Sequence, residues 1–105
     1  MQRPQHYEKK IREAKKKIDE YKTYIMISEN YQDMIEILEQ NPDFTSYAGI
    51  MHEKYGFNGS QAGLVKLITV TDIVSKGKYL EKIGKLEKDI AWYEDCIKEL
   101  KGMVE

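Results

Sequence analysis

The chain has 105 residues, of which 33% are charged, and its formal net charge is −1 with one cysteine. The length predicts a single domain with a modest core, and the many charges with only two prolines favour exposed helix faces over disorder. The lone Cys96 excludes an internal disulfide framework, and the lack of an apolar membrane span or signal-peptide core predicts a cytoplasmic protein.

Charge is distributed unevenly along the chain. The net charge is +5 over residues 1–17, −7 over residues 18–53 and +1 over the remainder. The basic block consists of Lys9, Lys10, Arg12, Lys15, Lys16 and Lys17. Such a block on a helix is typical of a solvated face or of a face that complements a second copy, and it also fits a nucleic acid or an acidic partner.

A first long helix is predicted over residues 5–40. Pro4 suits a first helical turn, and apolar residues then recur at alternating steps of four and three. They are Tyr7, Ile11, Ala14, Ile18, Tyr21 and Ile25. The stripe then shifts by one residue and continues through Tyr24, Ile27, Tyr31, Met34 and Leu38. Asn41-Pro42 is expected to end the helix, because a residue before proline is pushed out of the helical region.

Residues 41–63 are predicted to form a connector. Thr45 or Ser46 is expected to cap a short helix, which Gly56 would close with a left-handed turn. Asn58-Gly59-Ser60 is a second turn signal. Residues 50–57 followed by 61–68 also have the outline of a helix-turn-helix, in which Lys66 is the only base of the second helix.

A second long helix is predicted over residues 64–104, with a break near Gly77. The stretch 64–71 is rich in β-branched residues and could be a strand. We expect a helix, because no convincing second strand exists and apolar residues of 64–74 share one helical face. The following stripe consists of Tyr79, Ile83, Leu86, Ile90, Tyr93, Ile97, Leu100 and Val104.

These elements predict an all-α fold: a long antiparallel helical hairpin with a short helical connector, coiled-coil-like and oligomeric, with a dimer expected. One helix cannot hide its stripe from water, so another helix of the chain or a second copy must cover it. The residues predicted to mediate self-association are Ile83, Leu86, Ile90, Trp92, Tyr93, Ile97 and Leu100.

The wide apolar end of the first helix and the connector predict a surface for an unidentified protein partner. This surface comprises Met34, Ile35, Ile37, Phe44, Tyr47, Met51 and Phe57. His6 and His52 lack a second ligand at metal spacing, and no pair of carboxylates is placed in a cleft. We therefore predict no metal, no cofactor and no catalytic residue.

The layout as a whole resembles a known family. A Tyr-rich helix from about 7 to 39, a Gly/Ser break over residues 56–63, and the run from Leu80-Glu81-Lys82-Ile83 to Ile97-Lys98-Glu99-Leu100 are similar to the N-terminal helical region of ArpU-type phage transcriptional regulators. In that family a DNA-binding helix-turn-helix follows, where this chain ends at Glu105, so no family site residue is carried over. The resemblance implies a phage or mobile-element origin in a bacterial host and a role through protein contacts.

The function predicted from these observations is a non-enzymatic protein-interaction module that regulates or inhibits its partner. One alternative is a nucleic-acid-binding transcriptional regulator that uses the basic N-terminal helix, and its signature would be affinity that falls with salt. A further alternative is an oligomer that sequesters a small ligand between subunits, in a pocket of tyrosines and lysines.

Overall fold

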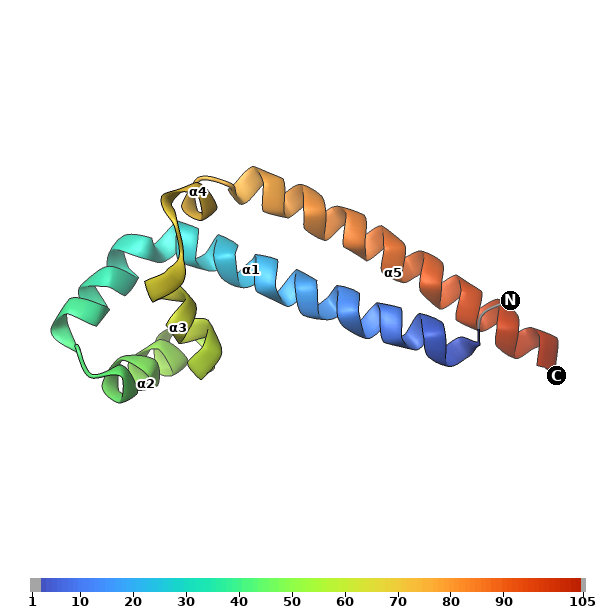
Figure 1. The fold of residues 1–105 in the computed structure, drawn as a ribbon, viewed down its shortest axis with the longest axis horizontal. Coiled ribbons are helices and arrows are strands. Elements are labelled where there is room, and N and C mark those ends of the chain that lie inside the picture. The colour runs from blue at the N-terminus through green and yellow to red at the C-terminus, as the bar shows by residue number, and fades with distance from the viewer. Residues whose placement is uncertain (1–2, 105) are drawn as a thin grey trace. The chain divides into compact units, whose positions relative to one another are not determined.

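The computed structural model describes residues 3–104, and the side chains up to residue 102 (Figure 1). Within that range the chain forms helices and no strand, which confirms the predicted all-α hairpin and excludes the alternative strand at 64–71. The helices are α1 (Pro4–Gln40), α2 (Phe44–Tyr55), α3 (Gly59–Leu67), α4 (Val70–Ile73) and α5 (Lys76–Val104).

The ends of α1 are those that the sequence predicts. The helix begins at Pro4 and ends at Gln40, before the Asn41-Pro42 pair. The Asn41 backbone N–H and side-chain amide both donate to the carbonyl of Ile37 at 3.0 Å, which satisfies an acceptor of the last turn.

α1 is kinked at Asn30, whose backbone angles (φ −126°, ψ 20°) are not helical. The Asn30 side-chain amide donates to the carbonyl of Met26 at 2.9 Å. In a regular helix this carbonyl would accept the backbone N–H of residue 30. The side chain therefore competes with the helical hydrogen bond, which is a recognised cause of helix bending.

The chain folds into two compact units, which are described separately. The first, called the hairpin unit, comprises Met1–Lys22 and Gly77–Glu105. The second, called the bundle unit, comprises Thr23–Lys76.

In the hairpin unit, the N-terminal half of α1 lies beside α5 and runs in the opposite direction (Figure 1). Ala14 and Ile18 from α1 are buried, as are Tyr79, Ile83 and Ile90 from α5. The rings of Tyr21 and Tyr79 stack with centroids 5.4 Å apart. The predicted four-three stripes thus pack on each other within one chain.

The bundle unit has its own core between α1, α2 and α3. Its fully or almost fully buried side chains are Ile27, Met34, Tyr47, Met51, Phe57, Ala62 and Val65. At roughly 1.5–3 kcal/mol for each large apolar side chain removed from water, this core is the main source of the unit's stability.

Short polar motifs determine where α2 and α3 begin and end. The Asp43 carboxylate caps α2 by accepting from the Ser46 backbone N–H at 3.1 Å, and Gly56 ends it with φ +71°. Asn58 and Gln61 form a reciprocal capping box at the start of α3, with both hydrogen bonds at 2.8 Å. The predicted Gly56 turn is confirmed, whereas Asp43 replaces the predicted Thr45 or Ser46 as the cap.

The chain between residues 64 and 104 is more broken than the sequence predicts. α3 ends at Leu67, and Thr69 caps the one-turn helix α4 through a second capping box with Asp72. The helix is interrupted at residues 68–69 and again at residues 74–75, and the second interruption lies close to the break predicted near Gly77. The reason is local: the Thr69 hydroxyl and the Asp72 carboxylate bind backbone N–H groups, which starts a new helix.

Candidate functional site

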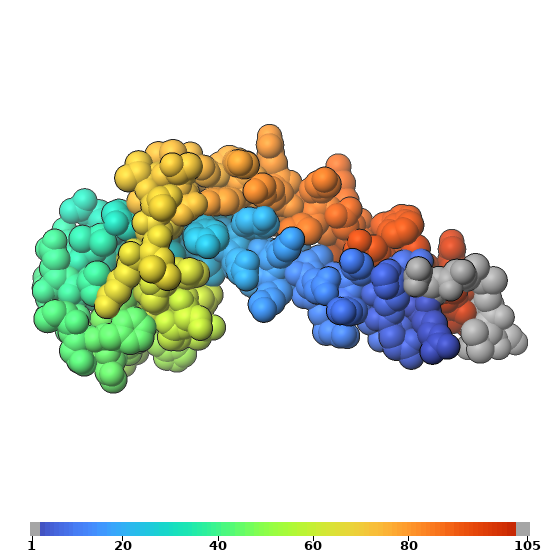
Figure 2. Space-filling model, in the orientation of Figure 1, coloured from blue at the N-terminus to red at the C-terminus, as the bar shows by residue number. Residues whose placement is uncertain are grey.

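The basic block forms an exposed face of α1 in the hairpin unit. All six of its side chains are exposed, whereas Ala14 and Ile18 of the same turns are buried. Lys9, Arg12 and Lys16 follow the spacing of one helical stripe. In the part of the chain from residue 3 to residue 102, no ion pair or side-chain hydrogen bond engages any of the six. The blue N-terminal turns are uncovered in the space-filling view (Figure 2).

The residues predicted for self-association are largely occupied within the chain. Ile83 and Ile90 are buried in the hairpin unit, and Leu86, Tyr93, Ile97 and Leu100 are half-buried. Trp92 differs, because 59% of its surface is exposed. The hairpin therefore covers most of the α5 stripe without a second copy, and self-association stays a prediction.

Trp92 belongs to an aromatic group of the hairpin unit. Its ring makes edge-to-face contacts with Tyr93, at a centroid distance of 5.4 Å, and with Tyr7 of α1, at 6.1 Å. Tyr7 also contacts Tyr93 at 6.0 Å and His6 at 5.3 Å. These contacts hold the indole against α1 while most of it remains open to solvent, which is uncommon for so large a side chain.

The surface predicted for a protein partner is corrected by the structure. Met34, Tyr47, Met51 and Phe57 are core residues of the bundle unit, with at most 2% exposed surface. Ile35 and Ile37 are half-buried against that core. The sequence shows that these side chains are apolar, but the short helices α2 and α3 fold onto α1 and cover them. A partner could reach them only if the unit opened.

Phe44 is the exception in that set, because it is 41% exposed. The Lys66 ammonium lies 5.1 Å from the centre of its ring, a cation–π distance. Lys66 is the only base of α3. The helix-turn-helix order of α2, the Gly56 turn and α3 is therefore present, but its second helix presents a single base that already contacts an aromatic ring.

A different apolar group is exposed in the bundle unit. Leu67, Val70 and Val74 lie within eight residues of one another, and each is 73–75% exposed. The prediction of one helix over 64–74 placed Leu67 and Val74 on one helical face. The break at residues 68–69 removes that shared face, and the Thr69-x-x-Asp72 spacing was the sequence signal that could have revealed it.

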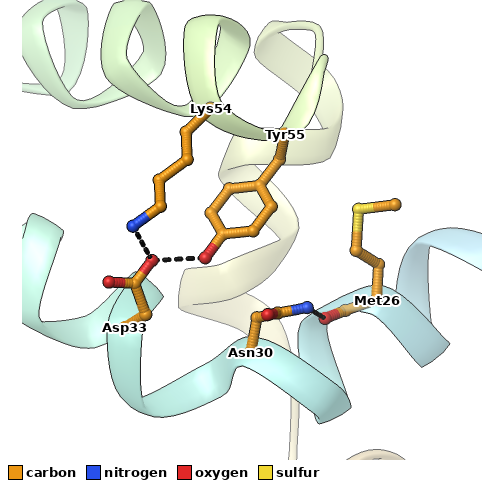
Figure 3. A network of polar contacts seen from close by, with 5 residues as sticks. All are labelled: Met26, Asn30, Asp33, Lys54 and Tyr55. Carbon is orange, nitrogen blue, oxygen red and sulfur yellow. Dashed lines mark hydrogen bonds and ion pairs between the residues drawn. The ribbon is translucent and has the colours of Figure 1, made fainter.

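A polar network joins α1 to the C-terminal end of α2 (Figure 3). The Asp33 carboxylate accepts a hydrogen bond from the Tyr55 hydroxyl and forms an ion pair with the Lys54 ammonium at 2.7 Å. The hydrogen bond from Lys54 and then that from Tyr55 lower the pKa of Asp33. Partial burial and the hydrogen bond to Asp33 raise the pKa of Tyr55 to about 12.

These shifts describe a structural clamp better than a catalytic site. Near neutral pH Asp33 is held ionised and Tyr55 is held protonated, whereas a general acid or base needs a pKa near the working pH. His52 lies nearby in sequence, and its Nδ1 is 3.1 Å from the carbonyl of Phe57. A carbonyl only accepts, so this contact is a hydrogen bond when Nδ1 carries the proton, and it then closes the turn between α2 and α3.

Two further properties of the described residues concern metals and membranes. Across this part of the chain, no three His, Cys, Asp or Glu side chains gather closely enough to hold a metal ion. Among the helices of the described range, none combines the length and apolar character needed to cross a membrane. Comparison of the chain with protein families, with curated proteins and with solved structures finds no match.

Proposed function

We propose that this chain is a non-enzymatic protein-interaction module, and that the exposed apolar group of Leu67, Val70 and Val74 is the centre of its partner-binding surface. The observation that carries the proposal is the exposure of these three side chains, about three quarters each, within one short segment. Single exposed apolar residues are ordinary, whereas three large ones within a segment of eight residues favour an interaction site.

The free energy of burying these three side chains favours the group as the anchor of an interface. Complete burial of each side chain would contribute roughly 1.5–3 kcal/mol to association. Because a stable interface covers about 800 Å² on each partner, further contacts must surround the three residues. A small apolar centre within a polar rim is the usual arrangement of such interfaces. The similarity to ArpU-type regulators is the reason for proposing a phage or mobile-element regulator or inhibitor.

The test is a comparison of three proteins as bait on a column: the native chain, the variant Leu67→Ser/Val70→Thr/Val74→Thr, and the control Leu80→Ser. Leu80 is also apolar and 52% exposed, but it lies in α5 outside the group. Since all four positions are exposed, stability should change by less than about 0.5 kcal/mol per site. We expect that proteins retained by the native and control baits are not retained by the triple variant.

Light scattering on the same three proteins distinguishes a second copy from a foreign partner. If the group mediates self-association, the native and control proteins share one molar mass and the triple variant has a smaller one. Equal masses and equal sets of retained proteins for all three baits would contradict the proposal.

A second candidate function is nucleic-acid binding by the basic face of α1. The observation that favours it is that all six bases are exposed and free of ion pairs within the described residues. Phosphate contacts release counterions, so affinity for duplex DNA should fall with salt with a logarithmic slope of about −0.9 per contact. Binding that is absent, or that does not change with salt, would remove this candidate.

A further inference from the structure

We propose that the hairpin unit carries a binding site for single-stranded nucleic acid, in which the Trp92 indole stacks on a base while Lys85 and Lys88 contact the phosphates. This inference rests on the second candidate function above and specifies its substrate class. It assigns a role to the exposed part of Trp92, which the contacts with Tyr7 and Tyr93 leave open.

The first step of the argument is the state of Trp92. It is 59% exposed, although it contacts Tyr7 and Tyr93. Those edge-to-face contacts orient the ring before any ligand arrives, so a stacking partner does not have to immobilise a free side chain. An oriented and solvent-exposed aromatic ring is the element on which single-stranded nucleic-acid proteins stack bases.

The second step is the charge around Trp92. Lys85, Lys88 and Trp92 are separated by three and four residues, so they share one stripe of α5. Both lysines are exposed, and in the described part of the chain no ion pair or side-chain hydrogen bond engages either. Glu81, four residues before Lys85, and Asp95, three residues after Trp92, continue the stripe at its two ends, and Asp89 lies three residues before Trp92. The basic section of the stripe is therefore the turn of Lys85 and Lys88.

The third step connects this stripe to the basic face of α1. Tyr7, which contacts Trp92, precedes Lys10 by three residues and therefore lies next to it on α1. The aromatic group thus borders the helix that carries the six exposed bases. A strand stacked at Trp92 meets positive charge from both helices of the hairpin unit, and this raises both its affinity and its rate of association.

The preference for a single strand follows from what each nucleic acid exposes. In a duplex the flat faces of the bases are stacked on one another, and only the groove edges and phosphates are accessible. An indole on a convex helix surface can stack only on a base that has left such a stack.

The experiment exploits Trp92 as the only tryptophan of the chain, so intrinsic tryptophan fluorescence reports on this residue alone. Unlabelled oligothymidine of about 16 nucleotides is titrated into the native protein, and affinity is measured in parallel from the anisotropy of a labelled copy. A duplex of equal length and heparin, a polyanion without bases, are the comparison probes. Each titration is repeated between about 50 mM and 200 mM salt.

We expect saturable quenching by oligothymidine, and tighter binding of it than of the duplex or heparin. Trp92→Ala should weaken oligothymidine binding by about tenfold, whereas Trp92→Phe should retain most of the affinity. Lys85→Gln/Lys88→Gln should reduce the logarithmic salt slope by about 1.4, because each single-strand phosphate contact contributes about 0.7. The matched control is Lys98→Gln/Lys101→Gln, two exposed lysines of α5 outside the stripe, which should leave the slope unchanged.

The two proposals fail in different ways. If oligothymidine, duplex and heparin bind equally and none quenches Trp92, the single-strand site is overturned while salt-dependent binding by the basic face remains. If no probe binds at low salt, both the site and the second candidate function are overturned. If Trp92→Ala binds oligothymidine as tightly as the native protein does, stacking is overturned whatever the lysine variants show.

Discussion

Tyr47 provides the sharpest test of the packing in the bundle unit. Its side chain has no exposed surface, and among the residues that the structure describes its hydroxyl has no hydrogen-bond partner. Burial raises the pKa of this phenol. A buried hydroxyl without a partner costs roughly 1–3 kcal/mol, because the hydrogen bonds that it made to water in the unfolded chain are not replaced.

Tyr47→Phe removes the hydroxyl and keeps the ring. We expect the free energy of unfolding to rise by about 1 kcal/mol, which corresponds to an increase in Tm of about 4–8 °C in a domain of this size. The measurement is urea denaturation followed by circular dichroism. The free energies of unfolding of the two proteins, extrapolated to zero urea, are compared, and equal m values show that the comparison is valid.

The matched control is Tyr55→Phe, in the same helix. The Tyr55 hydroxyl donates to the Asp33 carboxylate, so its removal should lower the free energy of unfolding by about 1 kcal/mol. The two variants delete the same atom, and the opposite sign of their effects is the prediction. If Tyr47→Phe destabilised the protein as much as Tyr55→Phe does, the Tyr47 hydroxyl would have a partner, such as a buried water, and the reasoning would be refuted.

Three further predictions concern the clamp and the α2 turn. Because Lys54 and then Tyr55 lower the pKa of Asp33 from 3.8, its stabilising contribution is present above about pH 4 and is lost as pH falls further. In Asp33→Asn, the urea midpoint of unfolding should fall less steeply as pH is lowered below about 4. The pKa of Tyr55 is raised from 10 to about 12 in the folded protein. The free energy of unfolding should therefore fall as pH rises from 10 to 12, by about 1 kcal/mol after solvent screening. Tyr55→Phe should abolish that loss. Gly56→Ala, at φ +71°, should lower the free energy of unfolding by about 1–2 kcal/mol. Gly49→Ala, in open space within α2, should raise it by about 0.5–1 kcal/mol. If urea denaturation showed that both variants change the free energy of unfolding in the same direction, this pair of predictions would be contradicted.

The long helices could be predicted because their signal is periodic and local. The four-three spacing from Tyr7 to Ile25 and from Tyr79 to Leu100 requires a helix to form a continuous stripe. The end of α1 at Gln40 followed from the restriction that Pro42 places on Asn41. Such information is carried by neighbouring residues, so the sequence alone reveals it.

The location of the bundle core could not be predicted in the same way. An apolar side chain such as Met51 or Phe57 looks the same in sequence whether it faces a core or a partner. Which of these applies depends on whether α2 and α3 fold back on α1, and this is a tertiary event that no local pattern encodes. The break before α4 was in principle predictable, because Thr69 and Asp72 have the spacing of a capping box.

The large exposed surface of Trp92 could not be predicted from the sequence pattern either. Trp92 is among the residues predicted for self-association, and the structure shows contact with Tyr7 together with a large open surface. A helical wheel gives the direction of a side chain but not how much of a large ring its neighbours cover. Only the hairpin packing decides that amount.

The packing of α5 on α1 also constrains how any dimer could form. Contact with a second copy through Ile83 and Ile90 would require α1 to leave α5, because both side chains are already buried in the hairpin unit. That opening would expose Ile18 as well, at roughly 1.5–3 kcal/mol for each of the three side chains, and a dimer would have to bury the same area again. A dimer that keeps the hairpin closed avoids this cost, and within the hairpin unit it could use the open surface of Trp92. Self-association through Trp92 and strand binding at Trp92 would compete, so added oligothymidine should convert such a dimer to monomers and lower the molar mass.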